Sequence, residues 1–97
     1  MRAAALRFEI HIPHSQSLKE KRAVLRPLVD GLRRMLSVSV SEVAHQNTWQ
    51  RTTIGVALVA PDGGRLDELI ERVQRYFEGQ LEIDLVGIEV YHMEEAP

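Results

Sequence analysis

The segment VSVSEVAHQNTWQRTTIGVALVA, residues 38–60, decides how the rest of the chain can fold. β-branched residues are frequent near both of its ends, which predicts two strands over residues 38–44 and 53–60. The connection between them, residues 45–51, is rich in hydrogen-bonding side chains and holds Trp49, the only tryptophan of the chain. The segment therefore predicts a β-hairpin with a polar turn, and the flanking elements can be placed relative to it.

The first strand of this hairpin carries an irregularity. Val38 and Val40 share one face, whereas Val43 falls on the opposite parity, because side chains alternate along a strand. An extra residue in one strand shifts that alternation by one position. We therefore expect a β-bulge near Ser41 and Glu42 that brings Val43 to the same face as Val40.

A strand and a helix are predicted upstream of the hairpin. Residues 3–12 alternate between apolar and other side chains, which is typical of a half-buried strand. Ser17 and Glu20 fit the capping-box pattern, so a helix should begin at Leu18. The apolar spacing of this helix continues through Pro27. We therefore expect one kinked helix rather than two separate ones.

A helix and a last strand are predicted downstream of the hairpin. Apolar residues recur at helical spacing over residues 65–78. Residues 83–93 predict a strand, with Val86, Ile88 and Val90 facing the core. The order of elements is then β-α-β-β-α-β.

This order predicts an α+β, ferredoxin-like fold, the split β-α-β-β-α-β arrangement. Right-handed crossovers place both helices on one face of a four-stranded antiparallel sheet, with the strand order 4-1-3-2. A chain of 97 residues is long enough for one such core. We therefore expect residues 1–97 to form a single ferredoxin-like domain.

The composition narrows the classes of function. The chain has no cysteine, which excludes disulfides and thiolate chemistry, and no apolar run long enough to cross a bilayer. We therefore expect a cytoplasmic protein with no membrane partner. Residues 1–35 carry eight basic and three acidic side chains, whereas the remainder carries four basic and eleven acidic ones. This asymmetry predicts one positively charged face, or simply two oppositely charged faces that keep the protein soluble.

The predicted topology brings two polar segments together. The first strand ends at the edge of the sheet where the hairpin turns, so residues 14–17, the start of the first helix and residues 45–51 should be neighbours. A helix N-terminus offers unpaired amides and a partial positive charge, which suit a phosphate or carboxylate. The candidate anion- or RNA-binding residues are cationic or hydrogen-bonding side chains of this edge: Ser15, Ser17, Lys19, Lys21, Arg22, Arg26, His45, Gln46, Trp49, Gln50 and Arg51. Lys19, Arg22 and Arg26 continue to Arg33 as a basic stripe along the helix.

A purely local role is the alternative for each of these residues. A serine before a helix is justified by capping alone, which would account for Ser17. Trp49 could serve only to anchor the hairpin on the core.

The open face of the sheet is the second candidate surface. The side chains predicted to line it are Arg7, Glu9, His11, Gly55, Ala57, Val59, Glu89 and Tyr91. The aromatic pair on which RNA-recognition domains stack bases is missing from the two central strands. Small apolar residues mixed with charges resemble a subunit contact or a lightly covered second layer. The edge strand of the hairpin could also pair with a copy of itself. This face therefore favours a homodimer or a second layer over an RNA surface.

Enzymatic chemistry finds little support in the sequence. The four histidines, at positions 11, 14, 45 and 92, are spread along the chain, and a metal needs three or four converging ligands. His45 with Ser15 or Ser17 would lack an acid to orient the imidazole. We therefore expect no catalytic residues, no cofactor and no metal site.

Two stretches, HIPHSQSLKEKR at residues 11–22 and VSVSEVAHQNTWQR at residues 38–51, resemble the YlxP-like family of small bacterial proteins, a domain of unknown function numbered 503. The resemblance covers nearly the whole chain and implies a ferredoxin-like α+β fold. Family members are often encoded beside translation and ribosome-maturation genes, which hints at an RNA or ribosomal partner. Pro27 departs from the usual uninterrupted first helix. The resemblance implies no catalytic residues.

These observations lead to two main hypotheses. The first is a non-enzymatic module that contacts structured RNA or a ribosomal particle through the basic first helix and the turn at residues 45–51. The alternative is a protein-interaction or homodimeric assembly module without nucleic-acid binding. A small-anion sensor or an unrecognised enzyme is a third possibility.

Overall fold

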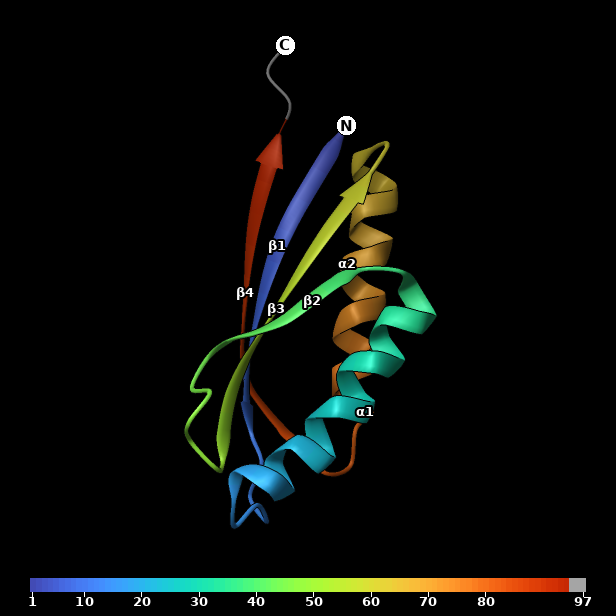
Figure 1. Cartoon of the computed structure of the whole chain (residues 1–97). Coiled ribbons are helices and arrows are strands. Elements are labelled where there is room, and N and C mark those ends of the chain that lie inside the picture. Colours follow the sequence, from blue (N-terminus) through green and yellow to red (C-terminus); the bar gives the residue numbers. More distant parts are fainter. Residues whose placement is uncertain (95–97) are drawn as a thin grey trace.

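The computed structural model of the chain describes residues 1–94. Its elements are β1 (Arg2–His11), α1 (Leu18–Leu36), β2 (Ser39–Ala44), β3 (Arg51–Ala60), α2 (Gly63–Glu78) and β4 (Asp84–Glu94). The strands form one antiparallel sheet in the order β2-β3-β1-β4, and both helices cover the same face of it (Figure 1). The predicted ferredoxin-like class and strand order are confirmed.

Both helices begin at a side-chain cap. The hydroxyl of Ser17 accepts a hydrogen bond from the amide of Glu20 at 3.0 Å, as the capping pattern predicts. The carboxylate of Asp62 accepts from the amide of Arg65 at 2.9 Å. This second cap starts α2 at Gly63, two residues earlier than the apolar spacing indicates. α1 runs as a single helix through Pro27, which confirms one helix rather than two.

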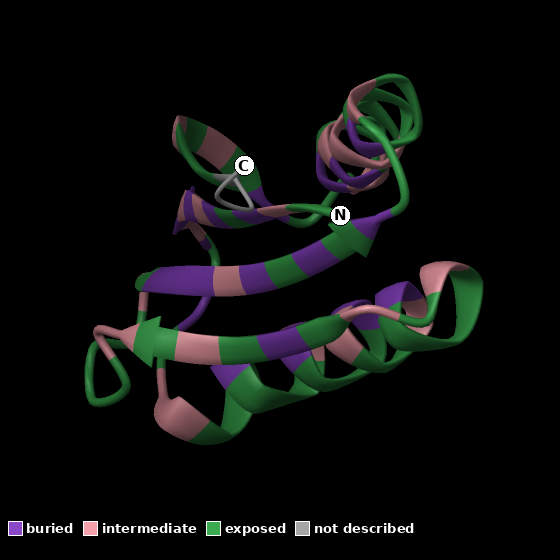
Figure 2. Cartoon of the chain, turned by 90° about the horizontal axis from the view of Figure 1, so that it is seen from above, coloured by how far each residue is buried: buried purple, intermediate pink, exposed green. Residues whose placement is uncertain are grey.

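The core lies between the sheet and the helices. Leu6, Phe8 and Ile10 of the central strand β1 point into it and are at most 2% exposed. The ring of Phe8 packs on Phe77 of α2 with centroids 4.4 Å apart. Figure 2 shows buried residues alternating with exposed ones along the strands. Burying a side chain of this size stabilises the fold by roughly 1.5–3 kcal/mol.

One predicted core position in β4 is wrong. Val86 is 67% exposed. The register of β4 against β1 shifts where Glu9 pairs with Gly87 and Ile10 pairs with Leu85, so Val86 is the extra residue of a bulge. Leu85 therefore takes the inward position and packs against the core.

The other predicted core positions of β4 stand opposite buried residues of β1. Ile88 is paired with Phe8 and packs against the core, as predicted. Val90 is paired with Leu6 but is still 36% exposed. The core face of β4 is therefore covered less well toward its C-terminal end.

The bulge predicted in β2 is present, but its effect on Val43 differs. Glu42 pairs with Ile54 and Ala44 with Thr53, which leaves Val43 as the extra residue. Val43 is 46% exposed and stays on the open face of the sheet, so the expected inward turn is wrong. The alternation shifts only after the bulge, at Ala44. A Cβ atom at Gly55 would lie 2.9 Å from Val43 Cγ1, so a glycine is needed beneath this side chain.

Candidate functional site

The end of β1 and the hairpin turn lie side by side, as the topology predicts (Figure 1). The amide of Ile12 donates to the carbonyl oxygen of Gln50 at 2.9 Å. The side-chain amide of Gln50 donates to the carbonyl oxygens of Ser15 at 3.0 Å and Pro13 at 3.4 Å. Segments more than 30 positions apart in the chain are therefore tied together at the N-terminal end of α1.

Lys21 is buried at this edge of the sheet. Its side chain is 2% exposed, and its Nζ lies 2.9 Å from Glu42 Oε2. The same ammonium donates to the carbonyl oxygen of His45 at 2.6 Å, and Glu42 also accepts from the hydroxyl of Thr52 at 2.5 Å. A buried ammonium needs such partners, because it has lost its hydration. Lys21 therefore drops out of the set of residues that could meet an external phosphate, which corrects the sequence-based expectation.

Three further candidates also serve the fold. Ser15 is 3% exposed, and its hydroxyl donates to the carbonyl oxygen of Ser17 at 3.1 Å. Ser17 caps α1, and Gln50 donates to backbone carbonyls of the preceding loop. The carboxylate of Glu20 accepts from the amide of Gln16 rather than from that of Ser17. The contacts of these three side chains agree with the alternative that they have a purely local, structural role.

The position of His45 is set by its backbone conformation and by hydrogen bonds to its carbonyl oxygen. It adopts the left-handed conformation with a φ of 62°, which costs a non-glycine residue roughly 1–2 kcal/mol. Its carbonyl oxygen accepts from the amide of Thr48 at 3.1 Å as well as from Lys21. These hydrogen bonds hold the turn in this conformation.

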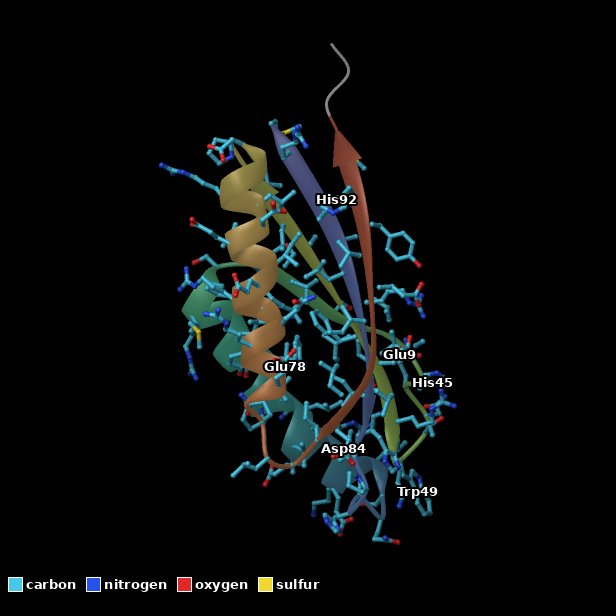
Figure 3. All side chains as sticks on the ribbon, turned by 180° about the vertical axis from the view of Figure 1, so that it is seen from behind. Glu9, His45, Trp49, Glu78, Asp84 and His92 are labelled. Atoms are coloured by element: carbon cyan, nitrogen blue, oxygen red, sulfur yellow. The ribbon has the colours of Figure 1, made fainter. Side chains whose placement is uncertain are left out.

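The His45 imidazole also lies near the carboxylate of Glu9 on the open side of the sheet (Figure 3). A hydrogen bond of 2.7 Å from the hydroxyl of Thr53 holds the pKa of Glu9 below its usual value. Arg7, whose guanidinium lies 3.3 Å from the carboxylate, and a charged His45 lower this pKa further, whereas burial opposes them. Glu9 is therefore a carboxylate held in its charged form.

The remaining candidates are exposed. They are Lys19, Arg22, Arg26, Gln46, Trp49 and Arg51. Within residues 1–94, none of the four cationic side chains among them has a hydrogen bond or ion pair. The surface at the start of α1 is thus positively charged and open to solvent.

A groove of about 390 Å³ runs between α1 and the edge strand β2. Its helical wall carries Arg22, Arg26, Arg33 and the ion-pair partner of Arg33, Asp30, and its strand wall carries Ser41 and Glu42. Arg33 belongs to the basic stripe of the sequence but was not in the predicted set, because it lies far along the chain from the helix start. Its guanidinium donates to the carbonyl oxygen of Val40 at 2.6 Å. The groove therefore lies between the middle of α1 and the edge of the sheet.

The open face of the sheet holds a shallow hollow of about 510 Å³. Small residues of the two central strands form its floor, and Arg7, Val43 and Tyr91 stand around it. The hydroxyl of Tyr91 donates to the carboxylate of Glu89, and this hydrogen bond raises the pKa of Tyr91. The predicted positions of Arg7, Gly55 and Tyr91 on this face agree with the structure.

The part of the chain that the structure describes contains neither a metal-ligand cluster nor a helix that could span a membrane. No group of three His, Asp or Glu side chains comes close enough to hold a metal ion within residues 1–94. His11 Nδ1 lies 3.8 Å from Asp84 Oδ2, but no third ligand joins them. Among the described helices, none is both long and apolar enough to pass through a membrane.

Comparisons with known proteins show the family to which this chain belongs. A family model described as "Protein of unknown function (DUF503)" matches residues 3–90. The chain is 38% identical over 68 residues to "Uncharacterized protein YlxP" of Bacillus subtilis (strain 168), an alignment that covers 70% of this chain and 74% of that protein. The solved structure "De novo designed protein Foldit4" is similar with a TM-score of 0.52 at 14% identity, over 97% of this chain and 99% of the designed one. The last similarity concerns the fold alone.

Proposed function

The chain belongs to the DUF503 family of proteins of unknown function, and from this premise we propose that it is a non-enzymatic binding module for structured RNA or a ribosomal particle. The carrying observation is the row of exposed cationic side chains on α1, Lys19, Arg22 and Arg26, which have no ion-pair partner within residues 1–94. Unpaired cations of this kind are available to phosphates, whose contacts supply much of the affinity for nucleic acids. Such a partner would be met in the cytoplasm.

The spacing of these cations supports a backbone contact. Arg22 and Arg26 are one turn apart, about 6 Å along the helix axis. Both line the groove between α1 and β2, and β2 leads into the hairpin turn that carries Trp49, which Arg51 follows at the start of β3. A nucleic-acid strand in this groove would meet the guanidinium groups first and the polar turn next. The turn would then supply the selective contacts, from His45, Gln46 and Trp49.

A double substitution of the basic row tests this proposal. We expect Lys19→Ala/Arg22→Ala to weaken binding to a fluorescent stem–loop RNA and to ribosomal subunits about tenfold or more at low salt, since two phosphate contacts are lost. Arg65→Ala/Arg72→Ala is the matched control, because it removes the same charge from α2, whose side chains lie away from the groove. Fluorescence anisotropy and co-sedimentation measure the effect. Equal binding by the parent and the first variant would rule the proposal out.

A homodimer formed through the open face is the second candidate. Ala3 is paired with Val59 and Met93, which are 66% and 69% exposed, so an apolar row crosses the sheet. The buried Nε of Arg7 has no acceptor within residues 1–94, and Glu89 is its partner across the ladder. A two-fold axis parallel to the sheet and running between β1 and β4 would place the Arg7 of each copy opposite the Glu89 of the other. This charge arrangement favours a second copy over an unrelated partner.

Light scattering tests the second candidate. The dimer would be much less sensitive to salt than RNA binding, because apolar area dominates the contact. Val59→Glu would convert it to a monomer without loss of secondary structure. Glu68→Gln, an exposed change on α2, is the control. A parent chain that stays monomeric at high micromolar concentration would eliminate this candidate.

A further inference from the structure

We propose that Trp49 is a stacking platform for an unpaired nucleobase. This inference rests on the proposed RNA contact and specifies which part of the RNA the hairpin turn recognises. The sequence left open that Trp49 anchors the hairpin on the core. The structure is against this, because the indole is 52% exposed and projects outward at the end of the hairpin (Figure 3). Within residues 1–94 its ring contacts no other aromatic ring.

The turn that carries Trp49 is held rigidly from both sides. On one side, the ammonium of Lys21 and the amide of Thr48 both donate to the carbonyl oxygen of His45. On the other side, Gln50 donates through its side chain to the loop before α1 and accepts through its carbonyl from the amide of Ile12. An aromatic ring on a fixed turn loses little conformational entropy on binding, so its position is preorganised for a planar ligand.

The surroundings of the indole favour a base over a protein partner. Protein hot spots lie near the centre of an interface, in well-packed pockets from which water is excluded. Trp49 instead has polar, exposed neighbours in Gln46, Asn47 and Thr48, and an exposed guanidinium two residues away in Arg51. A single aromatic ring among hydrogen-bonding groups and a cation is the combination on which single-stranded nucleic acids stack. Arg51 would meet the phosphate beside the stacked base.

The location of the indole also selects the kind of RNA. A base within a duplex is stacked on its neighbours and unavailable, whereas a base in a loop, bulge or single-stranded end can lie flat on the ring. The basic row Lys19, Arg22 and Arg26 would hold the adjacent backbone in either case. Duplex binding would then need the row alone, and loop binding would need the row and Trp49 together.

Tryptophan fluorescence tests this proposal directly, because Trp49 is the only indole in the chain. We expect a uridine oligonucleotide and a stem–loop RNA to quench its emission, and a blunt duplex of the same length to leave it unchanged. In anisotropy measurements Trp49→Ala should bind the stem–loop about tenfold to a hundredfold more weakly, whereas Trp49→Phe should retain most of the affinity. The salt dependence should be the same in both variants, since no charge is removed. Circular dichroism confirms that the exposed substitutions leave the fold intact.

The outcomes separate this inference from the proposed function. Parent-like binding by Trp49→Ala, together with weak binding by Lys19→Ala/Arg22→Ala, would overturn the stacking role and leave the RNA contact standing. Quenching by intact ribosomal subunits but not by their deproteinised RNA would assign the indole to a protein contact and also overturn it. Failure of the parent to bind any of these probes would end both proposals.

Discussion

Lys21 shows how one side chain can fix a turn that lies 24 positions away in the chain. Its ammonium contacts the carboxylate of Glu42 and the carbonyl oxygen of His45 at once. The lysine lies on α1, and both partners belong to the β2–β3 hairpin. The conformation of the proposed binding turn therefore depends on a residue that no ligand can reach.

Lys21→Met should lower the free energy of unfolding by about 2–4 kcal/mol, because it leaves Glu42 without its cation and His45 without a donor. Glu42 is 27% exposed at its side chain, so water relieves part of the cost. Urea denaturation measures the change. Lys19→Met is the matched control, since Lys19 is exposed and unpaired within residues 1–94, and it should stay within about 0.5 kcal/mol of the parent. A similarly small effect of Lys21→Met would contradict the buried pair.

Thr53→Val should raise the pKa of Glu9, because it removes the hydroxyl donor that most strongly favours the carboxylate. A carboxyl whose pKa is lowered by folding stabilises the protein above its unfolded pKa, and this contribution is lost as the pH falls through the folded pKa. The parent should therefore exceed Thr53→Val in stability at neutral pH, by about 1 kcal/mol. This difference in stability should shrink as the pH falls below the usual pKa of a glutamate carboxyl group.

Carboxyl NMR titration and urea unfolding at two pH values measure these effects of Thr53→Val. Thr53→Ser, which keeps the hydroxyl, is the control. A Glu9 pKa that is unchanged in Thr53→Val would show that the hydrogen bond is not its cause.

The two helices meet at a point where a glycine is required. The hydroxyl of Tyr76 on α2 donates to the carbonyl oxygen of Leu28 on α1 at 2.5 Å. A Cβ atom at Gly31 would lie 2.6 Å from that hydroxyl but 3.6 Å from the ring carbon that bears it. The glycine therefore accommodates the hydroxyl group rather than the ring.

The effect of Gly31→Ala on the stability of the protein should depend on whether residue 76 carries a hydroxyl group. Alanine gains about 1 kcal/mol over glycine within a helix, but here it displaces the Tyr76 hydroxyl and breaks the hydrogen bond to Leu28. We expect Gly31→Ala alone to destabilise the protein by about 1 kcal/mol. In a Tyr76→Phe background, where the hydroxyl is absent, the same change should be stabilising. Thermal unfolding of the four proteins gives the coupling, and a stabilising effect in both backgrounds would argue against this contact.

At the level of elements, periodicity predicted each helix and strand that the structure describes. It did not predict the exposure of Val86 and Val43 at the two bulges, or the first residue of α2. Alternation alone could not locate Val86, because the bulge that exposes it depends on how β4 pairs with β1. The same holds for Val43, which keeps its place on the open face because Gly55 leaves room for it. The early start of α2 follows from the Asp62 cap, a signal that is present in the sequence but is not part of the apolar spacing that predicted this helix.

At the level of the whole molecule, connectivity predicted that the start of α1 and the hairpin turn would be neighbours. It could not tell which side chains of that edge face inward. Lys21 and Ser15 are buried there, whereas Lys19 and Arg22, one or two positions away from Lys21, are exposed. A helix turns by about 100° per residue, so adjacent cations have different fates, and only the packing against β2 decides between them.

The charge distribution predicts how binding should respond to salt. The whole chain carries a net charge of −2, so any attraction to RNA must come from its local basic surface. If Lys19, Arg22, Arg26 and Arg51 each meet a phosphate of a single strand, log K should fall against log salt with a slope of about −3. Each alanine variant should reduce the slope by about 0.7, whereas Arg72→Ala should not change it. A slope near zero would exclude phosphate contacts.

The burial of one ammonium beside an exposed one has a chemical consequence. The chain contains two lysines, at positions 19 and 21. An acylating reagent should modify Lys19 at once and reach Lys21 only when the first helix lifts away from the strands beneath it. The ratio of the two adducts, read by mass spectrometry, would therefore serve as a clock for the opening of that end of the protein.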